Sequence, residues 1–286
     1  FAKYCKVFSL INHFQIFHFH SPYPLKFIAP IFWLKKPQKI IYTRHGANPL
    51  ASSHWKKLHK YIEEKIDAIT FVSQEGADVF RANHGWYDKR LEVIDNGVNI
   101  KSIKLNGHNS DKLRLGSVGR MVELKHQVSL LQAVSLLTEE EQGQLEINFF
   151  GDGPCEKLLK DYTLKNLHHT TIKFHGMVSD RNTIYGNIDA LVVTSETEGL
   201  SLAIIESMAF GCLTIGTNVG GNPKLIDNDV NGWLFEFNDI KLLASCIKRL
   251  LIQPELLTVM GEDAHKKMVK QFSLEASAKK YLLLYD

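Results

Sequence analysis

The amino-acid sequence predicts an α/β protein with two doubly wound, Rossmann-like domains. The chain has 286 residues, which is more than one typical domain of about 100–200 residues contains. Short apolar or β-branched runs alternate with longer helical patterns throughout, as is typical of parallel βαβ units. The composition, 44% hydrophobic and 23% charged, is that of a globular protein and excludes disordered, collagen-like and coiled-coil chains.

The front half contains four predicted strands, and a polar stretch follows them. The strands are expected within residues 14–20, 39–46, 68–73 and 91–97. Residues 105–111 are polar and show no apolar period, so a domain boundary is expected there. We therefore assign residues 1–108 to a first domain.

The second half repeats the alternation of strands and helices. Strands are expected within residues 113–119, 145–151, 171–176, 190–195, 213–217 and 232–235, and helices within 126–137 and 201–209. This second domain is assigned to residues 109–270. Residues 271–286 contain a capping-type Ser273 followed by apolar residues at helical spacing, which predicts a closing helix. Its position alone does not say on which domain it packs.

Cysteine spacing and hydropathy indicate the compartment. The four cysteines form no CxxC pair, so neither a zinc site nor a disulfide framework is expected and a reducing compartment fits best. No run of 18 apolar residues occurs, and the first ten residues lack the features of a signal peptide. A cytoplasmic location is expected, and a peripheral position on the inner face of the membrane stays open.

Positive charge is concentrated in the front half. Residues 1–105 carry 16 Lys and Arg against 8 Asp and Glu, which suggests an anionic partner. No arginine-rich run or aromatic RNA-binding motif accompanies this charge, so nucleic acid is not expected as a partner. The segment 24–36 is apolar, contains Trp33 and has flanking lysines. Two interpretations stay open for it, an anionic membrane surface and an ordinary buried helix.

The segment SETEGLSLAIIESMAFG, residues 195–211, is the most informative. It predicts a strand end, a Gly turn and a helix whose first N–H groups, at Ser201 and Leu202, form an anion site suited to a diphosphate. Glu206 would lie about 7.5 Å further along the helix axis, roughly the distance from a diphosphate to its ribose. Glu198 precedes the turn and could accept hydrogen bonds from sugar hydroxyls. The alternative is two solvated glutamates that flank a helix start.

Together with GCLTIGTNVGGNPKLI and NGWLF, this segment resembles the family 4 (group 1) retaining glycosyltransferases of GT-B fold. The resemblance implies two Rossmann-like domains that face a cleft. It implies that Glu198 binds the transferred sugar, that Glu206 binds the ribose of a nucleotide-diphosphate donor, and that Gly199, Leu200, Ser201 and Leu202 bind the donor at the helix start. This chain has ESMA where the family usually has EAMA, and Ser201 where the family often has Pro or Gly. In both places the residue present is a small one.

Two further segments resemble donor-binding parts of this family. In VGRMVELKH, Arg120 and Lys125 match the two cations that hold the donor diphosphate, and cations there would offset charge that grows as the diphosphate leaves. Solvated loop charges are the alternative. HGMVSD resembles the loop around the nucleotide base, which implies base contacts for Gly176, Met177 and Val178.

The front half carries two histidine motifs that resemble family segments. YTRHGAN contains His45, which matches a histidine on the side of the transferred sugar and the acceptor. HFHSPYP contains His20, whose counterpart serves structure or the acceptor. For both, a purely structural histidine is the alternative.

No cofactor or metal is expected. The Gly151-x-Gly153 pair lacks the third glycine of a dinucleotide fingerprint, and Asp227-x-Asp229 lies in a polar turn. The resemblance implies instead a nucleotide-diphosphate sugar as donor substrate, with a UDP-sugar favoured.

The resemblance implies a retaining hexosyl- or N-acetylhexosaminyl-transferase that acts on a glycan or lipid-linked acceptor in polysaccharide or lipopolysaccharide assembly. Family members have further strands before residue 14, so about 80 residues of the N-terminal domain are expected to be absent here and that domain to be incomplete. Two alternatives stay open, a GT-B nucleotide-sugar epimerase and a catalytically silent sugar-nucleotide-binding or scaffold protein.

Overall fold

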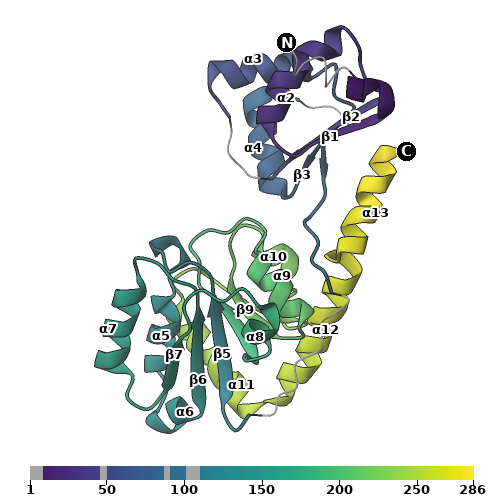
Figure 1. The fold of residues 1–286 in the computed structure, drawn as a ribbon. Coiled ribbons are helices and arrows are strands. Elements are labelled where there is room, and N and C mark those ends of the chain that lie inside the picture. The colour runs from purple at the N-terminus through teal and green to yellow at the C-terminus, as the bar shows by residue number, and fades with distance from the viewer. Residues whose placement is uncertain (1–8, 46–49, 87–90, 101–109) are drawn as a thin grey trace. The chain divides into compact units, whose positions relative to one another are not determined.

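The computed structural model describes residues 9–45, 50–86, 91–100 and 110–286. The chain divides into two compact units (Figure 1). Unit 1 comprises residues 1–97 together with 274–286, and unit 2 comprises residues 98–273.

Unit 1 contains a parallel four-stranded sheet in the order β1-β2-β3-β4. Its strands are β1 (Ile16–Phe19), β2 (Lys39–Arg44), β3 (Ala68–Phe71) and β4 (Leu91–Val93), and its helices are α2 (Pro22–Ile28), the 3-10 helix η1 (Ala29–Trp33), α3 (Ser53–Ile62), α4 (Gln74–His84) and α13 (Leu274–Tyr285). The four strands predicted in the front half and the closing helix are therefore confirmed.

The two faces of the unit 1 sheet differ in polarity. Because side chains alternate along a strand, one face carries Phe19, Tyr42 and Phe71, which belong to the hydrophobic core of the unit. The residues between them, His18, Thr43 and Thr70, point to the other face and are joined by hydrogen bonds. Helix α13 contributes to this second face, since its Tyr285 hydroxyl lies 2.7 Å from Nδ1 of His18. Helix α13, which follows unit 2 in sequence, thus belongs to the first unit.

The division between the units lies nearer the N-terminus than the 108/109 boundary expected from the polar stretch, which lies mostly outside the described residues. Val98 pairs with Ser273 through a β-bridge, and its N–H donates to the carbonyl of Phe272 at 2.9 Å. Val98 and Ile100 are buried in a core cluster of unit 2. Packing of these apolar residues therefore assigns residues 98–100 to the second unit.

Unit 2 contains a parallel six-stranded sheet in the order β10-β9-β8-β5-β6-β7. Its strands are β5 (Leu113–Val118), β6 (Leu145–Phe150), β7 (Thr171–Phe174), β8 (Ala190–Val193), β9 (Leu213–Thr217) and β10 (Gly232–Phe235). Its helical elements are η2 (Glu123–Lys125), α5 (Val128–Ser135), α6 (Glu139–Gly143), α7 (Glu156–Asn166), α8 (Arg181–Tyr185), α9 (Leu202–Ala209), α10 (Asn222–Leu225), α11 (Ile240–Ile252) and α12 (Glu255–Gln271). All six predicted strands and both predicted helices are present, so the predicted α/β fold class is confirmed.

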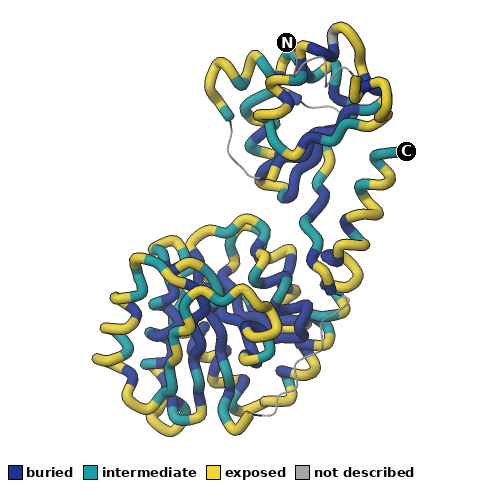
Figure 2. The backbone as a smooth tube through the Cα atoms, viewed as in Figure 1, coloured by how far each residue is buried: buried dark blue, intermediate teal, exposed yellow. Residues whose placement is uncertain are grey.

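Both faces of this sheet are buried, as a doubly wound fold requires. Along β8, Ala190 and Val192 belong to one core cluster, whereas Leu191 and Val193 belong to the other. The strands lie in the buried interior and the outer faces of the helices are exposed (Figure 2). The continuous apolar run ALVV is therefore explained by contacts on both sides of the strand.

The basic, apolar segment 24–36 forms parts of α2 and η1. Leu25, Ala29, Ile31 and Phe32 are buried in the core of unit 1, so the buried-helix interpretation holds for this face. Tyr23 and Phe27 are exposed, as is Leu34 just beyond η1. The segment thus has one core face and one apolar surface.

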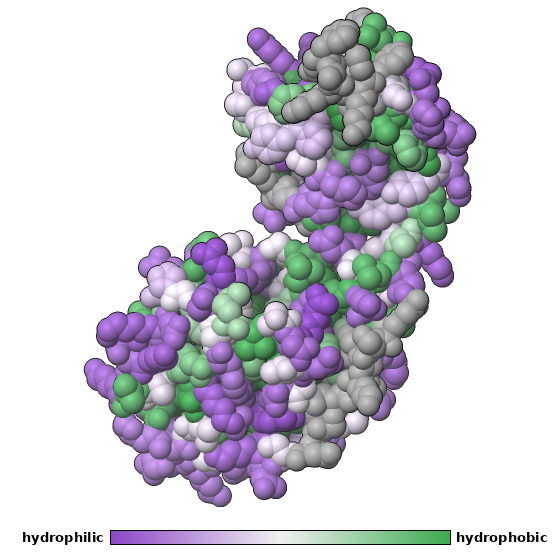
Figure 3. All heavy atoms as spheres, in the orientation of Figure 1, coloured by the Kyte–Doolittle hydropathy of each residue, from purple (hydrophilic) through white to green (hydrophobic). Residues whose placement is uncertain are grey.

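In the described parts of the chain, no helix combines the length and the apolar character needed to cross a bilayer. On the face of unit 2 visible in Figure 3, hydrophilic residues predominate and apolar ones form small separate spots.

His59 makes the stability of unit 1 depend on pH. Its ring is fully buried among Tyr42, Phe80 and His84, and burial, with charge on His84 and Arg44, lowers its pKa from 6.5 to about 3. Below about pH 6.5 His59 therefore binds a proton in the unfolded chain, whereas it stays neutral in the native state. We predict that the free energy of unfolding of unit 1 falls by up to about 1.4 kcal/mol per pH unit between pH 6.5 and pH 3 through this group.

Hydrogen exchange of the β2 amides at about pH 7 and about pH 5 measures this slope. His59→Leu should flatten it, and the exposed His168→Gln should leave it unchanged. An equal slope in wild type and His59→Leu would contradict the assignment.

Candidate donor site

The candidate site lies where two neighbouring strands of unit 2 end. β5 and β8 are adjacent and parallel, and the direction of strand succession reverses between them, which is where α/β sheets usually bind ligands. The loops that follow these strands are joined, because the Glu196 N–H donates to the Leu124 carbonyl and the Thr194 hydroxyl donates to the Lys125 carbonyl, both at 2.9 Å. The two loops thus form one surface at the carboxyl edge of the sheet.

Lys125 and Glu198 form an ion pair across these loops. Nζ of Lys125 lies 2.5 Å from Oε1 of Glu198, and the Ser195 hydroxyl donates to the same oxygen at 2.6 Å. The Glu198 side chain is only 9% exposed, while its Oε2 has no partner among the described residues. The carboxylate is thus oriented by one oxygen and has the other available to a ligand.

The loop after β5 is fixed by buried and closely packed backbone. Met121 is fully buried and anchors the loop, while a Cβ atom on Gly151 would lie 2.2 Å from the Gly119 carbonyl and one on Gly153 would lie 2.4 Å from that of Met121. The Gly-x-Gly pair therefore permits close packing of two loops. Arg120 is exposed, and its guanidinium has no partner in the described part of the chain.

Helix α9 begins beside Glu198 without a cap. Ser201 is the N-cap residue, but its side chain makes no capping bond, and the first turn contains no acidic residue. Its first N–H groups and the helix dipole therefore remain available to an anion. Gly199 and Leu200 form the preceding turn, where the Gly221 N–H donates to the Gly199 carbonyl at 3.0 Å. Leu202, the first helical residue, is half exposed. The diphosphate contact at Ser201 and Leu202 stays a prediction.

Glu206 lies one turn further along α9 and is held by two side chains of α8. Nε of Arg181 donates to Oε1 at 2.6 Å and the Tyr185 hydroxyl donates to Oε2 at 2.9 Å. Burial and the Glu206 charge raise the pKa of Tyr185, so its hydroxyl stays protonated and remains a donor. Each carboxylate oxygen keeps a further lone pair for a ribose hydroxyl.

The loop predicted to contact the base follows β7. Gly176 has a φ of 65° and its carbonyl accepts from the Gly151 N–H at 2.7 Å. Val178 packs against the core and Met177 is 74% exposed, which leaves an apolar side chain available to a planar ring.

The predicted site residues thus fall in both units. Lys125 and Glu198 touch one another, the residues from Gly199 to Leu202 follow Glu198 in sequence, and Glu206 contacts α8 instead. His45 belongs to unit 1, where its Nε2 lies 3.0 Å from Nδ1 of His20. These placements leave the functional roles as predictions.

The sequence did not single out Ser195, Arg181 or Tyr185. Ser195 is 1% exposed. It lies two residues after the apolar strand β8 and three residues before Glu198, and this position is a signal that the sequence contains. Arg181 and Tyr185 lie 25 and 21 residues before Glu206, and no spacing rule links positions on two separate helices.

The Asp227-x-Asp229 turn is accounted for by protein contacts. Asp227 pairs with Lys267 at 2.9 Å, and Asp229 accepts from the Trp233 indole at 2.9 Å and from Arg249 at 3.1 Å. No group of three His, Cys, Asp or Glu side chains is placed to hold a metal ion within the described residues.

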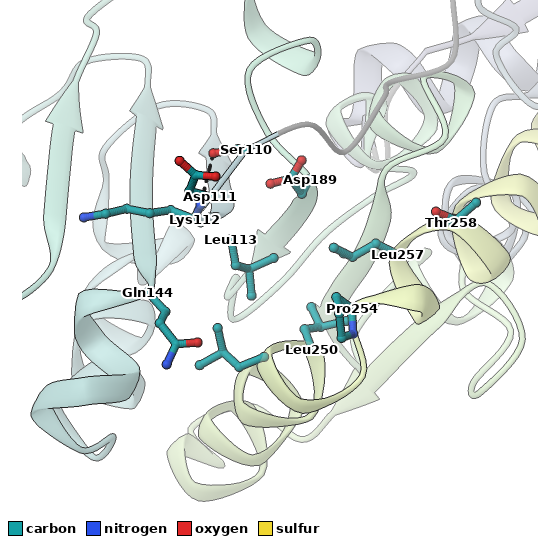
Figure 4. Close-up of a pocket in the computed structure, with 11 residues that line it drawn as sticks. Ser110, Asp111, Lys112, Leu113, Gln144, Asp189, Leu250, Pro254, Leu257 and Thr258 are labelled. Carbon is teal, nitrogen blue, oxygen red and sulfur yellow. Dashed lines mark hydrogen bonds between the residues drawn. The ribbon is translucent and has the colours of Figure 1, made fainter.

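A pocket lies at the opposite edge of the unit 2 sheet, at the amino ends of the strands. Leu113, Gln144, Asp189 and Leu257 are among the residues that line it (Figure 4). Oδ1 of Asp189 is bound by Arg114 at 2.6 Å. The pocket contains none of the predicted site residues.

Comparison with known proteins identifies the family. Residues 99–267 match the family model of glycosyl transferases group 1, and residues 2–102 match that of glycosyltransferase family 4. The chain belongs to the group 1 glycosyltransferases. The predicted family is therefore confirmed, and with it an enzyme class that transfers sugars.

Sequence relatives agree with this assignment, and a solved structure shares the fold. The N-acetyl-alpha-D-glucosaminyl L-malate synthase of Bacillus anthracis is 27% identical over 86% of this chain and 67% of its own length. The capsular polysaccharide biosynthesis glycosyltransferase CapM of Staphylococcus aureus is 22% identical over 95% and 78%. HepE of Anabaena, solved in complex with UDP, superposes with a TM-score of 0.81 at 18% identity, over 98% of this chain and 80% of that one. The last comparison shows the shared fold.

We predict that Glu206→Gln weakens binding of the free nucleotide diphosphate by about 10- to 100-fold, because a hydrogen bond to a charged group is worth about 1.5–3 kcal/mol. Isothermal calorimetry with UDP measures the change. Glu262→Gln, an exposed carboxylate on α12, is the matched control. Unchanged affinity in Glu206→Gln would remove this residue from the site.

Proposed function

We propose that the chain transfers a hexose or N-acetylhexosamine, with retention of configuration, from a nucleotide-diphosphate donor to a glycan or lipid-linked acceptor. One observation carries the proposal. The joined loops after β5 and β8 hold Lys125 against Glu198 at the start of an uncapped helix that also bears Glu206. A cation for the diphosphate, a carboxylate for the sugar and an anion site at a helix start thus occur side by side, as the binding of a nucleotide-diphosphate sugar requires.

The donor would lie along the carboxyl edge of the unit 2 sheet. Its diphosphate would meet the first N–H groups of α9, Glu206 would bind the ribose, and the loop from Gly176 to Val178 would contact the base. We favour a UDP-sugar, which the fold shared with HepE in its UDP complex supports. The proposal includes no cofactor.

Arg120 and Lys125 would stabilise the diphosphate as it leaves. Charge on the leaving group increases as the glycosidic bond breaks, and fixed cations lower the energy of that state. Glu198 would orient the sugar through its free oxygen, and His45 of unit 1 would serve the sugar and acceptor side. The departing diphosphate would help to remove the acceptor proton on the same face, so no enzyme nucleophile is required.

The acceptor is proposed to be a growing glycan or a lipid-linked sugar in the assembly of a surface polysaccharide or lipopolysaccharide. The relationship to CapM, a capsular polysaccharide glycosyltransferase, supports this class. Calorimetry with UDP, GDP and ADP, followed by UDP-sugars, tests the donor half of the proposal. Binding of none of the three nucleotides would contradict it.

We predict that Lys125→Ala and Arg120→Ala each lower kcat by about 10- to 1000-fold, which corresponds to about 1.4–4 kcal/mol of transition-state stabilisation. Donor affinity should fall less, because the charge that these cations face is greatest in the transition state. Lys157→Ala, an exposed lysine on α7, is the control.

The measurement separates kcat at saturating donor from the donor dissociation constant, with an acceptor found by screening glycans and lipid-linked sugars. Loss of donor affinity with full kcat in both variants would make the two cations ground-state anchors.

We also propose that unit 1 meets an anionic membrane through the exposed side of α2. Tyr23 and Phe27 are four residues apart on this helix and more than 60% exposed, and Leu34 is 80% exposed. Lys26 and Lys35 are exposed in the same segment. Aromatic residues bordered by lysines suit the headgroup region.

Binding to anionic vesicles should therefore exceed binding to neutral ones and should weaken as salt rises through the physiological range. Vesicle sedimentation measures both, and Phe27→Ser with Lys26→Ser should reduce binding. Lys157→Ser in unit 2 is the matched charge control. Equal binding to neutral and anionic vesicles would contradict the charge argument.

A further inference from the structure

Two histidines meet at the carboxyl ends of adjacent strands in unit 1. His20 follows β1 directly and His45 follows β2 directly, and the two strands pair in register at Phe19 and Tyr42. Nδ1 of His20 lies 3.0 Å from Nε2 of His45. The ring centroids are 5.3 Å apart with planes 26° from parallel. Both residues are exposed, so a ligand can reach them.

This hydrogen bond limits the protonation states that the two histidines can adopt together. A hydrogen bond between two ring nitrogens needs one donor and one acceptor, so it cannot persist when both rings are imidazolium. Unstrained imidazoles prefer the proton on Nε2. With the observed atoms, both rings keep that preference if Nε2–H of His45 donates to Nδ1 of His20. Nδ1 of His45 then carries a lone pair.

His20 is itself held by a neutral ring. The His18 ring centroid lies 4.2 Å from that of His20. Nδ1 of His18 meets the Tyr285 hydroxyl and Nε2 meets the Thr43 hydroxyl, each at 2.7 Å. Burial, with charge on His20 and His45, lowers the pKa of His18 to about 4, so this ring is uncharged near neutral pH.

Among the residues that the structure describes, the titratable groups facing the pair carry no negative charge. His18 on β1 and the two tyrosines of α13, Tyr281 and Tyr285, face the network. Arg44, the last residue of β2, lies over the Phe80 ring instead, at 5.1 Å. No carboxylate bonds either ring among the described residues. Burial and charge on His20 lower the pKa of His45, which favours the neutral ring with an available lone pair.

We propose that His20 is a positioning residue for His45: its bond to Nε2 fixes the ring and tautomer of His45, so that Nδ1 of His45 accepts a hydrogen bond from a hydroxyl of the sugar or acceptor. This inference rests on the proposed function, which puts His45 on that side. In this proposal His20 acts only through His45, and Nδ1 of His45 makes the contact with the substrate.

Nitrogen NMR of the full chain labelled with ¹⁵N-histidine tests the coupling without any substrate. Spectra near pH 7 should show His45 protonated at Nε2 and not at Nδ1. In His20→Leu this tautomer preference should weaken, and the titration midpoint of His45 should rise toward its ordinary value because a neighbouring positive charge is gone. His20→Gln should keep the tautomer, since its amide oxygen can accept from Nε2–H. His168→Gln is the control.

Transfer kinetics test the consequence. His20→Leu should lower kcat about 10-fold, the effect of one misplaced hydrogen bond, and should move the acidic limb of the kcat–pH profile to higher pH. The dissociation constant of free UDP, which lacks the sugar, should not change, and His20→Gln should recover most of kcat.

Two results would overturn the proposal: a His45 tautomer and midpoint that are the same in His20→Leu as in wild type, or unaltered kcat and pH profile in an active His20→Leu variant. If the wild-type chain transferred no sugar, the proposed function would fail, and the NMR result would still decide whether His20 controls His45.

Discussion

The pairing of β5 with β8 is the constraint on which the donor site depends. It places the end of the first strand of unit 2 beside the end of the fourth, and the residues that follow each strand become neighbours although they are 73 positions apart. Gly116 on β5 permits this approach, because a Cβ atom there would lie 2.6 Å from the Ile188 side chain. A substitution that separated these strands would separate Lys125 from Glu198.

Local devices then hold each group in place. Ser195 orients the carboxylate of Glu198, buried Met121 anchors the loop that carries Arg120, and the glycines at positions 151 and 153 allow the adjacent loop to pack closely against it. Glu198 and the backbone of the loop that carries Arg120 are therefore positioned by neutral, mostly buried groups. Preorganised charge is effective in catalysis because little reorganisation remains when the reaction occurs.

Sequence patterns predicted the strands and the site segments because both depend on local order. Each buried strand is a short run rich in apolar or β-branched residues, and the helix that carries Glu206 follows a recognisable glycine turn. The contacts of Arg181 and Tyr185 with Glu206, and of His20 with His45, join separate elements and depend on how those elements pack, which no spacing encodes. The boundary was expected at a polar stretch, whereas it is set by the burial of Val98 and Ile100 in the second core.

Because helix α13 belongs to unit 1, the two units receive all their residues at different times during synthesis. Unit 2 is continuous in sequence and has all its residues once Ser273 has left the ribosome. Unit 1 begins earlier but needs Tyr285, which lies 267 residues after its partner His18. Because domains fold as their chains emerge, the unit that is encoded in the middle can fold first. The contact between His18 and Tyr285 on the polar face of the first sheet can therefore form only after unit 2 has been synthesised.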